Sequence, residues 1–244
     1  MQLNNTLQNI LDNFDTSGTV FIAGNRNVIK LFEYEGITVN IKAFKVPNFI
    51  NKIIYKYFRE SKAKRSFTYA TILLEKGIGT PKPIAYYEQN SLLGLEKSFY
   101  VSEHLQFDLM FRDLVENSNY PNGKIILKQF MNFCYKLHQN GIEFLDHSPG
   151  NTLIKKEKED EYSFYLVDLN RMIFHEKMTF EERMKNLSRL TPFQDMIQIM
   201  SKEYALLSNE DEGLIFKTLW KYTSEFQYKF HRKKRIKNKL KFWK

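Results

Sequence analysis

The stretch Phe144-Leu145-Asp146-His147-Ser148-Pro149-Gly150-Asn151-Thr152-Leu153-Ile154 places a carboxylate and an amide on either side of a Pro-Gly bend. A second acidic residue, Asp168, ends the next apolar run. Phosphoryl transfer needs such groups, because one carboxylate must orient the attacking hydroxyl and oxygen ligands must hold magnesium against the phosphates. We therefore interpret Asp146 as the catalytic base, with Asn151 and Asp168 as magnesium ligands.

A purely structural interpretation competes with this one. In it, Asp146 and Asn151 cap a turn and Asp168 ends a strand, since Asp and Asn are common turn residues. The order of the elements favours the functional interpretation. A helix ends at Asn140-Gly141, a loop follows, then a hairpin, and then the second Asp.

The first third of the chain predicts an antiparallel sheet of five strands with one main helix. Glu35-Gly36 marks the reversal between two of these strands, and apolar residues at helical spacing predict a helix over Ile50–Lys76 that Gly77 ends. The strands are expected where β-branched and aromatic residues are concentrated, at Thr19–Ala23, Val28–Tyr34, Ile37–Phe44, Ile84–Glu88 and Ser98–His104.

The rest of the chain reads as mostly helical, so the fold class is α+β. A charged turn over Lys155–Glu161 is expected to join two short strands, Asn151–Ile154 and Phe164–Asp168. Helices are expected at Gly123–Asn140, Thr179–Asn186, Pro192–Leu207 and Asp211–Tyr228. The predicted division is an N-lobe over 1–104, a helical C-lobe over 105–230 and a basic tail over 231–244.

Composition is typical of a globular protein with a substantial core. Of its 244 residues, 43% are hydrophobic and 27% are charged, and the formal net charge of +9 favours polyanionic partners. The single cysteine, Cys134, excludes an intramolecular disulfide and is expected to be a packed core thiol. No signal peptide or membrane-spanning run is apparent, so we expect a cytoplasmic protein.

The two motifs resemble the catalytic loop and metal-binding Asp of protein kinases, His-Arg-Asp-x-x-x-x-Asn and Asp-Phe-Gly. They are more closely similar to the bacterial lipopolysaccharide kinase family, the Kdo and heptose kinases. Members of that family often show Asp-x-Ser-Pro-Gly-Asn in the loop and Asp-Leu-Asn-Arg at the metal Asp, as Asp146–Asn151 and Asp168–Arg171 do here. The similarity also touches Ser61–Phe67 and Gly77–Ile84, and spans roughly residues 19–244.

This resemblance implies a two-lobe protein-kinase-like fold, ATP and Mg²⁺ as cofactors, and a sugar of a lipopolysaccharide precursor as acceptor. In the kinase pattern Val-Ala-Ile-Lys, the lysine that binds the α and β phosphates corresponds to Lys42, with Lys45 as the next candidate. No acid is assigned as its partner, and Glu60 and Glu75 are the available ones.

Four further residues are expected at the nucleotide. Gly24 and Arg26 occupy the position of the glycine loop, although a single glycine stands where protein kinases have three. Glu103 and Leu105 lie where the hinge would meet adenine.

Departures from protein kinases bear on the acceptor. Phe144 and Leu145 stand in place of His and Arg, and Asn170 in place of Gly. These favour a sugar or other small acceptor over a protein. The alternatives are another phosphotransferase of the same fold, of the aminoglycoside or choline type, and a pseudokinase that only binds ligands.

The tail 231–244 holds eight Lys and Arg residues and no acid, interleaved with Ile236, Leu240, Phe242 and Trp243. One interpretation is a solvated helix. The other is peripheral contact with the anionic inner face of the inner membrane. Charge alone does not indicate nucleic acid, and none is expected as a partner.

Overall fold

The computed structural model describes residues 4–24, 27–45, 60–92 and 94–241, with side chains as far as residue 238. The chain divides into two compact units. The first comprises residues 1–106 together with 166–171, and the second comprises 107–165 together with 172–244.

The first unit is built on a five-stranded antiparallel sheet in the order β1-β2-β3-β5-β4. Its strands are β1 (Thr19–Ala23), β2 (Asn27–Tyr34), β3 (Ile37–Phe44), β4 (Pro83–Ser91) and β5 (Gly94–Glu103). The turn between β2 and β3 has positive φ at Glu35 and Gly36, as expected of a tight reversal. Strand β4 ends at Ser91 and not at the predicted Glu88. Strand β5 begins at Gly94 and not at the predicted Ser98, and it ends at Glu103, so that His104 lies outside it.

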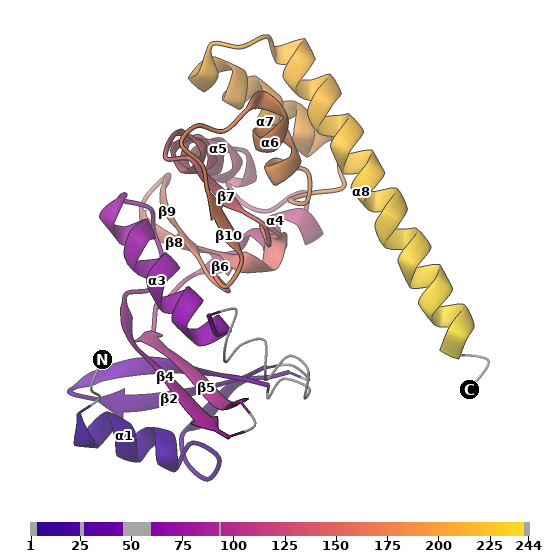
Figure 1. The fold of residues 1–244 in the computed structure, drawn as a ribbon. Coiled ribbons are helices and arrows are strands. Elements are labelled where there is room, and N and C mark those ends of the chain that lie inside the picture. The colour runs from indigo at the N-terminus through magenta and orange to yellow at the C-terminus, as the bar shows by residue number, and fades with distance from the viewer. Residues whose placement is uncertain (1–3, 25–26, 46–59, 93, 242–244) are drawn as a thin grey trace. The chain divides into compact units, whose positions relative to one another are not determined.

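Helices α1 (Asn5–Asp12) and α3 (Lys62–Glu75) cover opposite faces of this sheet (Figure 1). Val39 and Ile41 point to the α1 face, where they pack with Leu7 and Leu11. Because side chains alternate along a strand, Lys42 points to the other face. The register places Lys42 opposite Tyr100 and Tyr100 opposite Tyr86, whose ring contacts Phe67 of α3.

Helix α3 begins later than the sequence predicts. Ser61 is its N-cap, with an extended backbone and a side-chain oxygen that accepts from Lys64 N at 3.0 Å. A serine that caps a helix stops it from extending backwards, so Glu60 and Ser61 are not helical. The predicted segment Ile50–Arg59 lies outside the described residues. At the other end, Gly77 N–H donates to Leu74 O, as the predicted stop requires.

The second unit is mainly helical. Its helices are α4 (Phe111–Glu116), α5 (Gly123–Gln139), α6 (Phe180–Leu187), α7 (Gln194–Ser208) and α8 (Glu212–Lys241). The central helix α5 buries Ile126, Phe130 and Leu137 in the core, as its apolar spacing predicts. Cys134 is fully buried on the same helix, and burial raises the pKa of its thiol.

Short strands frame the predicted catalytic loop. Strand β7 (Ile142–Phe144) precedes the loop and pairs with β10 (Met172–Phe174), while a 3-10 turn at Pro149–Asn151 leads into β8 (Thr152–Lys158). Strands β6 (Leu109–Met110), β8 and β9 (Glu161–Leu166) form a small sheet. The predicted charged turn Lys155–Glu161 is wrong in extent. The turn is confined to Glu159 and Asp160, because two residues are enough to close a hairpin and Asp is one of the residues that tolerate the positive φ found at Asp160.

Helix α8 continues 13 residues past its predicted end at Tyr228, to Lys241, because no Gly or Pro interrupts it and Lys and Arg are good helix formers. Its first half buries Ile215, Leu219 and Thr223. Every residue from Tyr228 to Asn238 is exposed, and this half extends beyond α6 and α7 (Figure 1). Across the described ranges, no helix is both long and apolar enough to cross a membrane.

Candidate active site

Lys42 and Asp168 form an ion pair within the first unit. Lys42 Nζ lies 2.6 Å from Asp168 Oδ1, although the two residues are 126 positions apart in the chain. The lysine is largely buried, and its ammonium also lies 5.2 Å from the centre of the Phe44 ring. The carboxylate is more accessible, with 36% of its side chain exposed. The predicted phosphate lysine and one predicted magnesium ligand are therefore brought together.

The backbone around Asp168 is unusual and is tied to the first unit. Asp168 has a φ of 59°, a left-handed conformation that non-glycine residues adopt at a cost and that tends to occur at functional sites. Leu166 anchors the segment, since its N–H donates to Gly79 O at 2.9 Å and its carbonyl accepts from Thr80 Oγ1 at 2.8 Å. Asn170 Nδ2 donates to Asp168 Oδ1 at 2.6 Å. The carboxylate is therefore held by Asn170 and Lys42, while Leu166 fixes the backbone two residues before it.

Neither acid considered as a helix partner contacts Lys42. Glu60 pairs with Lys64 at 2.8 Å, which raises the pKa of that lysine, and Glu75 is exposed at the C-terminal end of α3. The partner of Lys42 among the described residues is Asp168, which lies outside α3.

The other predicted nucleotide residues lie along the same sheet. Gly24 N–H donates to Asn27 O at 3.1 Å across the β1–β2 turn, while Arg26 lies outside the described residues. Lys45 is exposed just after β3. The structure thus places Lys42 on the strand and Lys45 beyond it.

The predicted hinge begins at Glu103, the last residue of β5. Glu103 N–H donates to Lys82 O and His104 N–H donates to Thr38 O, both at 2.9 Å, so the sheet uses these two amides. Among the backbone bonds of the described residues, none engages the N–H of Leu105. The ring of His104 contacts that of Phe21 on β1, edge to face, with 5.3 Å between centroids.

Asp146 and Asn151 belong to the second unit and share one compact loop. Asn151 Nδ2 donates to Asp146 O at 2.8 Å, and Asn151 N–H donates to Ser148 O at 3.0 Å. Because its amide nitrogen is engaged in the loop, the side-chain oxygen of Asn151 remains as a ligand suited to a hard cation. Arg189 Nη1 donates to Leu145 O at 2.8 Å and supports the loop from outside.

A buried polar network holds the loop from behind. Asn186 of α6 donates from Nδ2 to Phe144 O at 2.8 Å, and its Oδ1 lies 3.0 Å from His147 Nδ1 and 3.2 Å from His138 Nε2. His138 Nδ1 lies 2.8 Å from the hydroxyl of Tyr204. The network therefore links the loop to α5, α6 and α7.

The bonding pattern assigns the proton positions. The amide oxygen of Asn186 only accepts, so both imidazoles must donate to it, and Tyr204 must then donate to His138 Nδ1. Burial lowers the pKa of His138 to about 3 and that of His147 to about 4. Both imidazoles are therefore neutral at physiological pH.

Arg183 anchors the far end of this network. It forms a two-pronged ion pair with Glu210, at 2.9 and 2.6 Å, and also contacts the Tyr204 hydroxyl at 3.3 Å. The guanidinium lowers the pKa of Glu210, and the carboxylate raises that of Arg183. A bidentate ion pair of this kind fixes the relative orientation of the two side chains in addition to bringing opposite charges together.

Two residues that support the loop, Asn186 and Arg112, were not predicted from the sequence. Asn186 follows Lys185 in a short helix, where an Asn normally reads as solvated, and only its burial reveals its role. Arg112 of α4 lies against Gly150, where an added β-carbon would overlap its guanidinium. Arg112 lies far from Gly150 in the sequence, so no local motif indicates this contact.

A family model and a solved structure are similar to this chain. The model of the family described as Lipopolysaccharide kinase (Kdo/WaaP) family matches residues 28–209, about three quarters of the chain. No curated protein matches the chain.

A solved structure described as "WaaP in complex with acyl carrier protein" is similar in fold, with a TM-score of 0.64 at 14% sequence identity over 93% of this chain and 98% of that one. The predicted kinase-like fold and the predicted family are confirmed. The chain belongs to the Kdo/WaaP lipopolysaccharide kinase family and is a kinase, that is, a phosphotransferase.

Proposed function

We propose that this kinase uses ATP and magnesium to phosphorylate a sugar of the Kdo or heptose type on a lipopolysaccharide precursor. The ion pair between Lys42 Nζ and Asp168 Oδ1, at 2.6 Å, is the observation that carries the proposal. Phosphoryl transfer needs a cation for the phosphates beside a carboxylate for the metal, and Lys42 and Asp168 are proposed to fill these two roles.

Two oxygen donors are proposed to hold magnesium, the carboxylate of Asp168 and the side-chain oxygen of Asn151. Their chemistry fits, because Mg²⁺ prefers oxygen ligands and is usually bound by one or two carboxylates together with phosphates and water. Across the described residues no group of three or more His, Cys, Asp or Glu could hold a metal ion by itself. When bound, the metal would neutralise charge on the phosphates.

Asp146 is proposed to accept the proton of the attacking hydroxyl. Its loop is braced by Asn151, Arg189 and the Asn186 network, which supports a fixed position for this carboxylate. Glu103 and Leu105 are proposed to meet adenine through their backbone, and Gly24 and Arg26 to approach the phosphates.

The decisive experiment is a phosphotransfer assay with ATP and Mg²⁺ on a panel of acceptors, comprising Kdo- and heptose-bearing lipid A precursors, an aminoglycoside, choline and a generic protein. Turnover of the lipopolysaccharide sugars alone is expected. If only the aminoglycoside or choline were phosphorylated, the protein would be a phosphotransferase of that type and not a lipopolysaccharide sugar kinase. Nucleotide binding without transfer to any acceptor would leave a ligand-binding pseudokinase.

Asp146→Asn tests the base. Turnover should fall by about 10²-fold or more, the usual effect of losing a positioned base, while ATP affinity and melting temperature stay near wild type. The matched control is Asp195→Asn, which removes an exposed carboxylate at the start of α7. Full activity of Asp146→Asn would remove Asp146 from this role.

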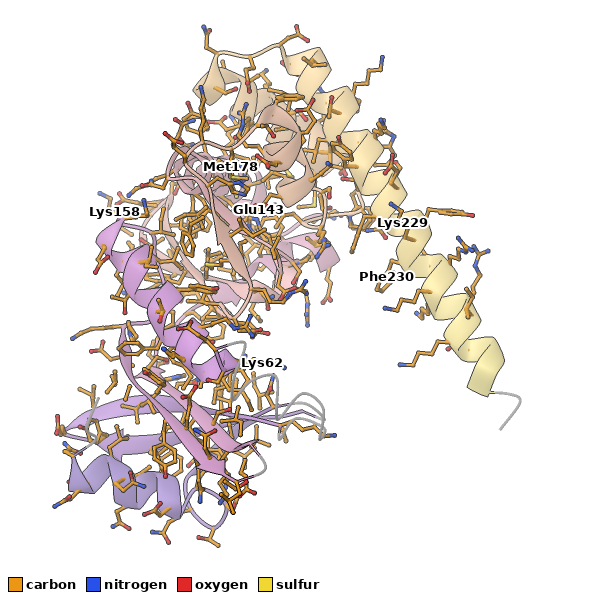
Figure 2. All side chains as sticks on the ribbon, in the orientation of Figure 1. Lys62, Glu143, Lys158, Met178, Lys229 and Phe230 are labelled. Carbon is orange, nitrogen blue, oxygen red and sulfur yellow. The ribbon has the colours of Figure 1, made fainter. Side chains whose placement is uncertain are left out.

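We also propose that the second half of α8 binds the anionic inner face of the inner membrane. Its exposed residues include Arg232, Lys233, Lys234, Arg235 and Lys237, together with the exposed aromatic side chains of Tyr228 and Phe230. Figure 2 shows side chains projecting to both sides of the helix in the part of α8 beyond Phe230. Each basic residue near an anionic surface contributes about 1 kcal/mol.

Sedimentation with anionic and neutral vesicles tests the contact. The protein should sediment with anionic vesicles only, and 0.5 M salt should release most of it, since the Debye length is then about 4 Å. A protein lacking 231–244 should lose this binding and keep ATP turnover on a water-soluble acceptor. Equal sedimentation of both proteins at low salt would contradict the proposal. The similar solved structure is described as a complex of WaaP with acyl carrier protein. Acyl carrier protein is therefore added to the same assay as a competitor of the vesicles for this protein.

A further inference from the structure

An open hollow of about 310 Å³ lies in the second unit behind the catalytic loop. Strand β7, the end of α6 and the middle of α8 form its walls, and Figure 2 labels Glu143 on β7 and Lys229 on α8 among its lining residues. Its volume is at the lower end of the range for small-molecule sites, which suits a single sugar unit. No role assigned above uses this hollow as a binding site.

Cations outnumber available acids in its lining. Lys185 and Arg189 are exposed, and Lys229 lies 3.9 Å from Glu225, a loose pair. The other acid, Glu143, is already bound to His175 at 2.9 Å. The hollow therefore presents three cationic groups and two carboxylates, an excess of one positive charge.

Two aromatic rings complete the lining, and they orient the cations. The Lys185 ammonium lies 5.3 Å from the centre of the Tyr222 ring, and the Arg189 guanidinium lies 5.2 Å from that of Phe226. Aromatic side chains commonly line the binding sites of small molecules. Flanking cations would bind a carboxylate or phosphate on the same ligand.

The hollow adjoins the residue before the proposed base. Leu145 lines it, and Arg189, which donates to Leu145 O at 2.8 Å, is shared between the hollow and the loop. A ligand seated here would lie one residue along the chain from Asp146.

We propose that this hollow is a binding site for an anionic sugar unit of the acceptor, with Lys185 and Lys229 holding its carboxylate or phosphate and Tyr222 packing against its ring. Its place in the reaction rests on the proposed function. The binding itself does not, because none of these residues is assigned to the nucleotide, the metal or the proton transfer.

The test measures binding without nucleotide, so that a failed kinase assignment leaves it interpretable. Dissociation constants for D-glucose, D-glucuronate and D-glucose 6-phosphate are determined by ligand-observed NMR. The wild-type protein should bind at least one anionic sugar more tightly than glucose, and the two anionic probes separate carboxylate from phosphate recognition.

Two sets of variants locate the site. Lys185→Gln with Lys229→Gln should weaken the anionic sugar about tenfold and leave glucose unchanged, since each exposed ion pair contributes roughly a two- to fivefold factor. The matched control, Lys202→Gln with Lys217→Gln, removes two exposed lysines of α7 and α8 outside the hollow. Tyr222→Leu should weaken all three sugars. Equal affinity of the wild type for charged and neutral sugars, or an equal loss in the control, overturns the proposal.

Discussion

Asn186 Oδ1 lies 3.0 Å from Nδ1 of His147, the residue that directly follows Asp146. The same amide donates to Phe144 O, two residues before Asp146, so one side chain of α6 holds the loop on both sides of the proposed base. All of its partners are buried, and because His147 Nε2 is buried without a hydrogen-bond partner, the bond to Asn186 is the one that holds the His147 ring.

Replacing Asn186 with Leu should lower both stability and turnover. The variant leaves two imidazoles and a carbonyl without this partner, and we expect the free energy of unfolding to fall by about 2–4 kcal/mol. Since the loop loses its support, kcat should fall with little change in the KM for ATP. The control is Asn132→Leu on the exposed side of α5. A variant that is destabilised but fully active when folded would show that the network only stabilises the fold.

The buried histidines make stability depend on pH. In the unfolded chain both titrate near their ordinary pKa of 6.5, whereas in the folded protein burial lowers the pKa to about 3 for His138 and about 4 for His147. Below pH 6.5 the unfolded state therefore binds more protons. Stability should be complete above that pH and fall as the pH drops toward 4, at up to about 3 kcal/mol per unit for the pair.

Urea unfolding between pH 7 and pH 5 measures this slope before most carboxylates titrate. The double variant His138→Gln with His147→Gln should have a flatter profile than the wild type. Equal slopes for the two proteins would show that these imidazoles are protonated in the fold or that other groups govern the response.

Lys42→Met should reduce catalysis far more than stability. The substitution keeps the length of the side chain and removes the charge proposed for the phosphates, so a loss of about 10²-fold in kcat/KM is expected. Lys45→Met, just beyond β3, is the matched control and should be nearly silent. If only Lys45→Met were inactive, the phosphate lysine would be Lys45.

Gly141 should be far less tolerant of substitution than Gly36. Both have positive φ, at 69° and 79°, but a β-carbon at Gly141 would overlap the backbone carbonyl of His175, whereas none would be met at Gly36. We expect Gly141→Ala to cost about 2–4 kcal/mol and Gly36→Ala about 1 kcal/mol, measured by urea unfolding. A similar loss of unfolding free energy at both positions would mean that the backbone around His175 moves at little cost to make room for the β-carbon.

Regular pattern made much of the fold predictable. The β-branched and aromatic residues concentrated in β1 to β5 and the apolar spacing of α5 and α7 extend over enough residues to identify these elements. Helix α1 and strands β7 and β10 are too short for that. They exist because tertiary contacts complete them, such as Leu7 and Leu11 packing against the sheet.

The residues of the candidate site could be predicted where they belong to one continuous motif. They could not be predicted where a contact joins residues that are far apart in the sequence. Asp146 and Asn151 share a loop that the sequence itself outlines. The acid beside Lys42 was sought on a helix, yet it is Asp168, which was interpreted only as a metal ligand. Asn186 carries no sequence signal, because a polar residue on a short helix normally faces water, and Arg189 lies in the turn after α6 as an exposed arginine of ordinary appearance.

The exposed half of α8 affects how unfolding will be observed. A like-charged helix of this length is marginal by itself and depends on the packed half for nucleation. Its hydrogen bonds should open locally, at lower free energy than those of the core. A dichroism melt, which counts helical residues, should therefore begin to fall before a calorimetric melt, which follows the cooperative loss of the core.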